Sequence, residues 1–409
     1  MHILRRSLSF SAMLLLAGAN DMAVAASQVS DEAQHLHREM LVLDSHLDTP
    51  ARLDDPAWSI LDRHTVADNG SQVDLPRMIE GGLDGGFWVA FTPQGPLEAA
   101  GYAHARKHAM DRLAAIGRMA DGSEGRLALA ERANDASMLA EGGRMLVYRS
   151  MENAYPLGED IGTLKQFRDL GVRMLGLVHM ANNQFADSAN DPAGPRWHGL
   201  SPAGRALITE ANRLGIVVDL SHASDEAFDQ AIALSSAPIL LSHSGCRDLF
   251  DRPRNIDDAR IRRLAANGGV IQISSIYMTR LPPDPARDAA VAELLAKFGS
   301  DIGPDRQAEF DTDRAALNAR FPVPRPTFDD FMGNLLHALR LVGPRHVGVG
   351  VDWDGGSDVD GFADVTMLPK VTERLMAAGY SRADIENVWG GNLLRVVREA
   401  ERQTREDKQ

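Results

Sequence analysis

The stretch that decides the fold is LVLDSHLDTP, residues 41–50, in which His46 and Asp48 follow directly on the apolar run from Met40 to Leu43. A strand that ends in His-x-Asp places both side chains on one face, because successive side chains of a strand point to opposite sides. The carboxyl ends of the strands are where α/β barrels assemble their catalytic sites. The segment therefore predicts a strand whose end carries two potential metal ligands.

The same arrangement recurs along the chain, because five further apolar runs end in a residue that can bind metal or transfer protons. They are LVYRSM before Glu152, VRMLGLV before His179, GIVVDLS before His222, APILLS before His243 and HVGVGV before Asp352. Taken singly, each residue also fits a structural role, such as a histidine packed in the core or a carboxylate that caps the next helix. Ligands on the ends of several parallel strands converge on one point, so the recurrence favours one shared site.

Strand-like runs alternate with helical stretches, which is typical of an α/β protein with a parallel sheet. The predicted strands span 40–44, 87–91, 144–150, 172–178, 216–220, 238–242, 269–274 and 346–351. An open doubly wound sheet is the alternative, but it gives no reason for ligands on strands one, three, five, six and eight. We therefore predict a TIM-like (β/α)8 barrel.

Residues 1–25 have the features of an export signal. MHILRR is basic, SFSAMLLLAGA is apolar, and Ala23-Val24-Ala25 is a small-residue cleavage site. The apolar run is too short to span a bilayer as a helix. We expect cleavage to leave one barrel domain at residues 26–409, which is periplasmic or secreted and has no stable membrane insertion.

One connection, at about residues 277–345, is too long for a simple crossover between strands. It contains the helical stretch PARDAAVAELLAKFGS and the proline-rich FPVPRPT, after which Thr327 is the predicted N-cap of a helix. Ser201 is likewise the predicted N-cap of the helix in SPAGRALITEANRLG. The helical insertion would lie beside the site, where it could form a lid, a surface element or a dimer contact.

Composition limits the partners of the chain. With 409 residues, of which 44% are hydrophobic, it can bury a large core. The formal net charge of −14 argues against binding to nucleic acid or to an anionic membrane. The single cysteine, Cys246, excludes an intrachain disulfide; a metal-ligand role is conceivable, but we expect a small packed side chain.

Further motifs carry a family resemblance. They are VDLPRMIEGG at 73–82, Asn183, RN at 254–255, GVGVDWDG at 348–355 and GGNLLRV at 390–396. Together with DSHLD, Glu152, His179, DLSH and SHS they resemble the membrane (renal) dipeptidase family. Its members are zinc peptidases on a (β/α)8 barrel of the amidohydrolase, metal-dependent hydrolase type. The resemblance covers most of residues 40–400.

The resemblance implies two zinc ions per chain. One would be held by His46 and Asp48, the other by His222 and His243, with Glu152 bridging both. Histidine nitrogens and carboxylate oxygens are ligands that suit zinc. Related amidohydrolases carry His-x-His on strand one and a modified lysine as the bridge, so Asp48 and Glu152 favour the dipeptidase branch.

The resemblance also implies the chemistry, which is hydrolysis of a dipeptide by a metal-bridging hydroxide. His179 would donate to the carbonyl oxygen as it becomes anionic. Asp352 would shuttle a proton from the water to the departing amine. Arg254, supported by Asn255, would bind the substrate carboxylate, whereas an isolated Arg254 would fit an ordinary surface arginine.

Two departures from the family pattern and the role of Asp354 leave details open. Beyond strand seven this chain reads Ser274-Ser275-Ile276-Tyr277, where an aromatic substrate contact is expected earlier. Many relatives have Gly-Gly-His after the bridging glutamate, where this chain has Asn153-Ala154-Tyr155, so the side-chain preference of the pocket is not predicted. Asp354 could support the site or hydrogen-bond the turn at Gly355-Gly356, and the turn is favoured.

Two alternatives to a dipeptidase remain at this point. One keeps the metals but acts on another small amide, such as an N-acyl amino acid or a lactam. The other is a noncatalytic periplasmic maturation or binding factor that retains the fold. Against it, all the predicted metal ligands and Asp352 are present, so the sequence does not indicate a site that has lost its catalytic residues. The predicted partners are a dipeptide substrate and, in a possible homodimer, a second copy of the chain.

Overall fold

The computed structural model describes residues 29–279, 284–298 and 306–406, so the predicted export signal lies outside the described residues. Within them, one parallel sheet has nine strands. The strands are β1 Leu43–Leu47, β2 Gly85–Phe91, β3 Leu127–Leu129, β4 Met145–Glu152, β5 Val172–Gly176, β6 Val217–Asp219, β7 Leu240–Ser244, β8 Val270–Ile273 and β9 Val347–Val349.

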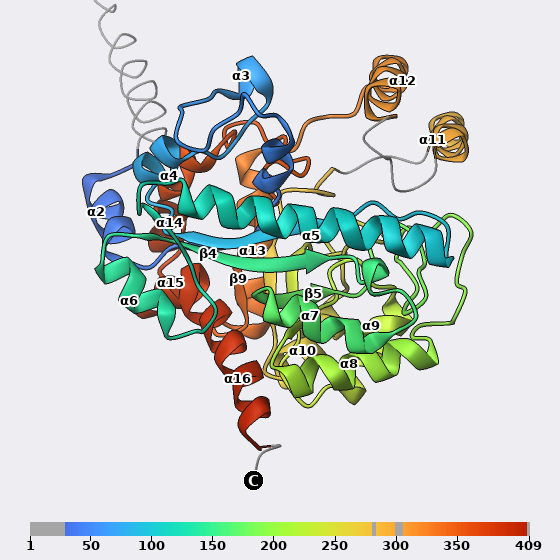
Figure 1. Cartoon of the computed structure of the whole chain (residues 1–409). Helices are drawn as coiled ribbons and strands as arrows, with labels where there is room; N and C mark the ends of the chain where they lie inside the picture. Colours follow the sequence, from blue (N-terminus) through green and yellow to red (C-terminus); the bar gives the residue numbers. More distant parts are fainter. Residues whose placement is uncertain (1–28, 280–283, 299–305, 407–409) are drawn as a thin grey trace, which may run out of the picture.

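Eight of these described strands form the barrel, in the order β1-β2-β4-β5-β6-β7-β8-β9, and the helices pack around them (Figure 1). The end of the first strand meets the segment that follows the last strand. Leu47 and Trp353 form a parallel bridge there, and the backbone N–H of Asp48 donates to the Trp353 carbonyl at 2.9 Å. The predicted (β/α)8 barrel is confirmed.

The sheet differs from the sequence prediction in one additional strand and in the ends of most strands, with the largest shift in β1. β3 is an additional strand, which pairs with β4 outside the barrel order and is only three residues long, too short for a recognisable pattern. β1 begins at Leu43 instead of residue 40, because the N–H of Val42 bonds to the Asp84 carboxylate at 2.8 Å and not to a strand. β1 also ends at Leu47 and not at residue 44, so His46 lies within the strand and not after it.

The helices have the following bounds: α2 Asp31–Glu39, α3 Val66–Asn69, α4 Leu75–Gly81, α5 Ala99–Asp121, α6 Asp135–Glu141, α7 Leu164–Asp169, α8 Pro202–Leu214, α9 Asp225–Leu234, α10 Asp258–Ala266, α11 Pro285–Phe298, α12 Gln307–Arg320, α13 Phe328–Val342, α14 Pro369–Ala377, α15 Arg382–Glu386 and α16 Asn392–Glu406. Short helices η1 Thr49–Asp54, η2 Tyr155–Leu157, η3 Ile161–Thr163, η4 Val365–Met367 and the π-helical η5 Asn387–Gly391 lie between them.

Two predicted helix starts are confirmed. The Ser201 side chain accepts from the N–H of Gly204 at the start of α8. The Thr327 side chain accepts from the N–H of Asp330 at the start of α13, and the Asp330 carboxylate bonds back to the Thr327 backbone. No described helix is both long and apolar enough to cross a membrane.

The segment 277–345 divides into two parts. α13 packs against α10 and β9 and therefore belongs to the barrel. α11 and α12 stand apart from the strands and contact each other (Figure 1), with Lys297 Nζ 2.6 Å from the Asp313 carboxylate and the rings of Phe298 and Phe310 edge to face. The segment that projects from the barrel is thus the pair α11 and α12.

Candidate metal centre

The five predicted metal ligands come from four strands and meet inside the barrel. They are His46 in β1, Asp48 directly after it, Glu152 at the end of β4, His222 after β6 and His243 in β7. Four of them are buried, and the Asp48 side chain is 19% exposed. The parallel ladder brings these positions to one end of the barrel although up to 197 positions separate them in the chain.

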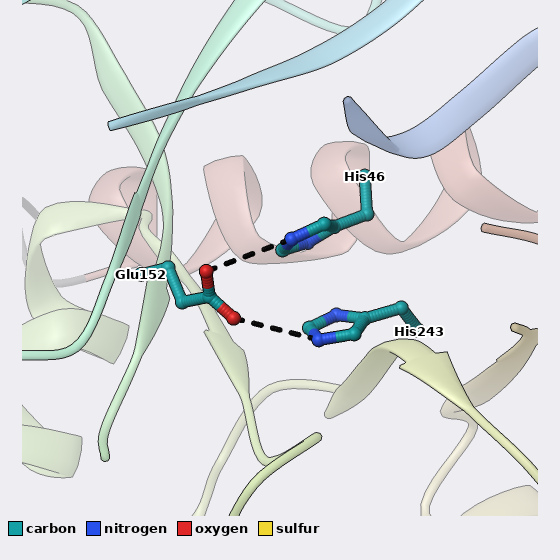
Figure 2. Close-up of side chains that lie close together, drawn as sticks. All are labelled: His46, Glu152 and His243. Carbon is teal, nitrogen blue, oxygen red and sulfur yellow. Dashed lines mark ion pairs between the residues drawn. The ribbon is translucent and has the colours of Figure 1, made fainter. Parts of the chain in front are cut away.

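The Glu152 carboxylate lies between the two groups of predicted ligands. Its Oε2 is 3.7 Å from His46 Nε2, and its Oε1 is 3.4 Å from His243 Nε2; both rings point toward it from the opposite side (Figure 2). Oε1 is also 3.0 Å from His222 Nε2. Each carboxylate oxygen therefore faces one group, which is the arrangement that a bridging carboxylate requires.

On the His46 side of the cluster, the donor atoms fit a metal ion better than they fit one another. His46 Nε2 and Asp352 Oδ1 are buried and have no hydrogen-bond partner among the described residues. His46 Nε2 is 3.6 Å from Asp48 Oδ1, too long for a hydrogen bond. Two ligands that bind one zinc ion at about 2.1 Å with tetrahedral geometry lie roughly 3.4 Å apart. The His46 nitrogen and the Asp48 oxygen are thus spaced as two ligands of one metal ion.

Burial and neighbouring charges set the protonation of the cluster. Burial would lower the pKa of His46, but the carboxylates of Glu152 and Asp48 raise it to about 10. Burial holds the pKa values of His222 and His243 well below the usual range, so both are neutral, the form of histidine that binds metal. The neighbouring carboxylates thus favour a positive charge at His46, which a metal cation would supply in place of the proton.

Asp352 follows β9 and lies at the same end of the barrel, within reach of His46 and Asp48 as part of a possible three-residue metal group. Its backbone has a φ of 72°, a left-handed conformation that aspartate tolerates better than most residues. Burial raises the pKa of the Asp352 carboxyl to about 6. This value is near the range in which a carboxyl group exchanges protons at neutral pH.

The Asp354 carboxylate bonds to neighbouring loops and not to the turn at Gly355-Gly356, which the sequence favours as its partner. Its carboxylate accepts from the Thr49 hydroxyl at 2.7 Å, from the Gln72 N–H at 2.8 Å and from Arg52 at 3.3 Å. The turn is formed instead by the N–H of Gly355, which donates to the Asp352 carbonyl. Asp354 therefore ties the segment after β9 to the residue that follows Asp48.

Gly355 fills a position at which a side chain does not fit. A Cβ there would overlap the carboxylate oxygens of both Asp352 and Asp48. We expect Gly355→Ala to lower zinc affinity about 10- to 100-fold, because overpacking costs about 1–3 kcal/mol. Competition with a chelator measures the affinity. Gly333→Ala in α13, where an added Cβ meets nothing within 4 Å, is the matched control, and equal affinities in the two variants would contradict the prediction.

Arg254 is buried and not a surface arginine. Its Nη2 donates to the His243 carbonyl at 2.8 Å, its Nη1 lies 3.3 Å from the Ser244 hydroxyl, and its Nε has no partner among the residues that the structure describes. Asn255 donates its amide to the carbonyls of Phe250 and Tyr277 at 2.8 and 3.1 Å. Asn255 thus holds the loop that carries the guanidinium toward the site.

His179 follows β5 and lies at the edge of the cluster. Its Nε2 is 4.0 Å from Glu152 Oε1, and its ring centre is 4.3 Å from that of His222 and 4.7 Å from that of Phe91. With Glu152 and His222 it forms a group close enough to hold an ion. Its distance from Glu152 is nevertheless the longest among the four histidines.

Most of these residues, though not His46 or Asp354, line a cavity of about 410 Å³, a size typical of small-molecule sites. Sequence reasoning did not place Phe91, Met180 and Tyr277 in its wall, nor Arg314 of α12. Asn190 donates to the Tyr277 hydroxyl at 3.2 Å, a contact between distant loops that no local pattern reveals. Cys246 is buried outside this lining, so it is a packed side chain.

The comparison with known proteins agrees with this geometry. Residues 30–409 match the family described as membrane dipeptidase, peptidase family M19. The chain belongs to this family. Members of the family are hydrolases that act on peptide bonds, and the predicted enzyme class is therefore confirmed. Membership also implies a metal cofactor, for which the described clusters of histidine and carboxylate side chains are candidates.

Individual relatives extend over most of the chain. It is 30% identical to dipeptidase tcpJ of Claviceps purpurea over 340 residues, which are 82% of this chain and 70% of that protein. It is 30% identical to dipeptidase verJ of Clonostachys rogersoniana, with 80% and 75% covered. The structure of the probable dipeptidase PvdM from Pseudomonas aeruginosa is similar with a TM-score of 0.80 and 30% identity, covering 93% of this chain and 99% of that one.

Proposed function

We propose that the protein is a zinc-dependent dipeptidase with two zinc ions per chain. The observation that carries the proposal is the Glu152 carboxylate, whose two oxygens face separate groups of ligands on the floor of a cavity. His46 and Asp48 would hold one ion, and His222 and His243 the other. When bound, the ions would supply positive charge that acidifies a water and polarises the substrate carbonyl.

The remaining residues of the site would bind the substrate and move its protons. Asp352 has an unpartnered oxygen beside the metal ligands, so it would take the proton from the attacking water and return it to the departing amine. His179, at the edge of the cluster, would donate to the carbonyl oxygen as it becomes anionic. The buried guanidinium of Arg254 would bind the substrate carboxylate, which limits the substrate to a short peptide.

Arg254→Ala should raise KM for dipeptides roughly 10- to 100-fold, since a charge-assisted hydrogen bond contributes about 1.5–3 kcal/mol. KM for the corresponding dipeptide amides, which lack the carboxylate, should change little. Steady-state kinetics with both substrates measure the difference. Arg262→Ala changes an exposed arginine in α10 and is the control. Equal losses on both substrates would remove Arg254 from carboxylate binding.

The proposed activity is tested with purified, zinc-loaded protein and a panel of small amides. The panel contains L,L and L,D dipeptides, dipeptides with a blocked carboxyl end, N-acyl amino acids and lactams. Hydrolysis confined to dipeptides with a free carboxyl end is expected. Turnover of N-acyl amino acids or lactams alone would favour the other small-amide substrates, and zinc binding without any turnover would favour a noncatalytic factor.

We propose in addition that the protein is exported after cleavage of residues 1–25. The support is the basic, apolar and small-residue order of this segment. N-terminal sequencing of protein from the native cell should begin at Ala26, and an intact Met1 would contradict export by this route. The possible homodimer stays a prediction, which a mass measurement in solution tests.

A further inference from the structure

Beneath the metal ligands lies a buried hydrogen-bond network around Asp219, the last residue of β6. Asp219 Oδ1 accepts from the N–H of Ser221 at 3.0 Å, from the Ser221 hydroxyl at 2.6 Å and from the N–H of Ser242 at 2.9 Å. Asp219 Oδ2 accepts from the Ser242 hydroxyl at 2.5 Å. All three residues are buried. Asp219 therefore acts as an acceptor in every one of these bonds.

The direction of these bonds determines which nitrogen of His243 carries its proton. A serine hydroxyl has one hydrogen, and that of Ser242 is used by Asp219. The contact of 2.8 Å between Ser242 Oγ and His243 Nδ1 must then have the Nδ1–H of His243 as its donor. In a neutral imidazole the other nitrogen, Nε2, then has a free lone pair. This lone pair faces Glu152 and His222.

We propose that Ser242, oriented by Asp219, is a positioning residue that fixes His243 in the tautomer with Nε2 free to bind metal. The inference rests on the proposed metal site and adds a residue pair that is not among the ligands. Ser242 Oγ is also 3.4 Å from Nδ1 of His46, the histidine predicted to bind the other ion. By contrast, Nδ1 of His222, which is predicted to bind the same ion as His243, has no partner among the described residues, so the network orients His243 but not His222.

The tautomer is measured by ¹⁵N NMR of histidine-labelled, metal-free protein. The wild-type protein should show His243 protonated at Nδ1, and protonation at Nε2 would overturn the proposal. In Asp219→Asn the amide NH₂ would occupy the place of Oδ2 and donate to Ser242 Oγ. The Ser242 hydroxyl would then donate to His243 Nδ1, so the proton of His243 should move to Nε2. An unchanged tautomer in this variant would also overturn the proposal.

Zinc affinity gives a second readout. Ser242→Ala and Asp219→Asn should each lower it roughly 10- to 100-fold, as loss of a partner behind a metal ligand does in other sites. Ser150→Ala is the matched control, because Ser150 is a buried strand serine near the site whose hydroxyl has no partner among the described residues. Its zinc affinity should equal that of the wild type.

The outcomes separate the proposal from the proposed function. A wild-type protein that does not bind zinc would contradict the metal site itself. Wild-type binding together with equal affinities in Ser242→Ala and Ser150→Ala would overturn only the role of Ser242. Thermal unfolding of the metal-free variants shows whether they fold. If Ser242→Ala does not fold, the tautomer of His243 in the wild-type protein decides whether Ser242 has the proposed role.

Discussion

Asp352→Asn should lower kcat by about 10²–10⁴ and leave KM and zinc content nearly unchanged, because one general acid and base contributes about this factor. The substitution keeps the size and polarity of the side chain and removes only the group that accepts a proton. Metal content and steady-state kinetics measured on one preparation distinguish the possible roles of Asp352.

Asp360→Asn is the matched control, since Asp360 is an exposed aspartate eight positions further on that pairs with Arg325. It should behave as the wild type. A near-normal kcat in Asp352→Asn would show that the proton travels through another group. Loss of one zinc ion would instead make Asp352 a ligand, which its place in a group with His46 and Asp48 permits.

Glu152→Gln should lose both zinc ions and, with them, all measurable turnover. Glutamine has the shape of glutamate, but one of its two terminal atoms is an NH₂ group that cannot bind a metal ion. The loss of the negative charge weakens both sites, because each carboxylate oxygen faces a different group of ligands. Elemental analysis should show zinc falling from about two ions per chain toward none.

Glu141→Gln, an exposed glutamate at the end of α6, should retain both ions. Two zinc ions in Glu152→Gln would remove Glu152 from the bridge. Retention of one ion would place Glu152 on a single metal. Circular dichroism of the variants shows whether the barrel is intact in each case.

The sequence predicts the barrel and the convergence of its polar residues because both depend on local patterns. Apolar runs mark the strands, and the residue after each run has to lie at the carboxyl end of the sheet. The same reasoning places the start of β1 three residues early, since the bond from Val42 to Asp84 comes from a separate segment. The sequence thus predicts which end of the sheet a residue occupies more reliably than the residue at which a strand begins.

Contacts between distant loops could not be predicted. Asp354 bonds to Thr49 across 305 positions, and nothing near Asp354 in the sequence indicates that partner. Arg314 reaches the wall of the cavity from α12, a helix of the long connection whose place no local pattern in the sequence indicates. The serines of DLSH and SHS lie next to predicted ligands, yet the direction of their hydrogen bonds becomes visible only with the position of the Asp219 carboxylate.

The contacts between the first strand and the end of the last strand also affect the order in which the barrel folds. The N–H of Val351 donates to the Asp44 carboxylate across 307 positions, beside the bridge between Leu47 and Trp353. A nascent chain therefore cannot bring Asp352 beside His46 before its final strand has been synthesised and has docked. Because ions that bind only the native state favour it by mass action, zinc should protect the barrel as a whole against unfolding.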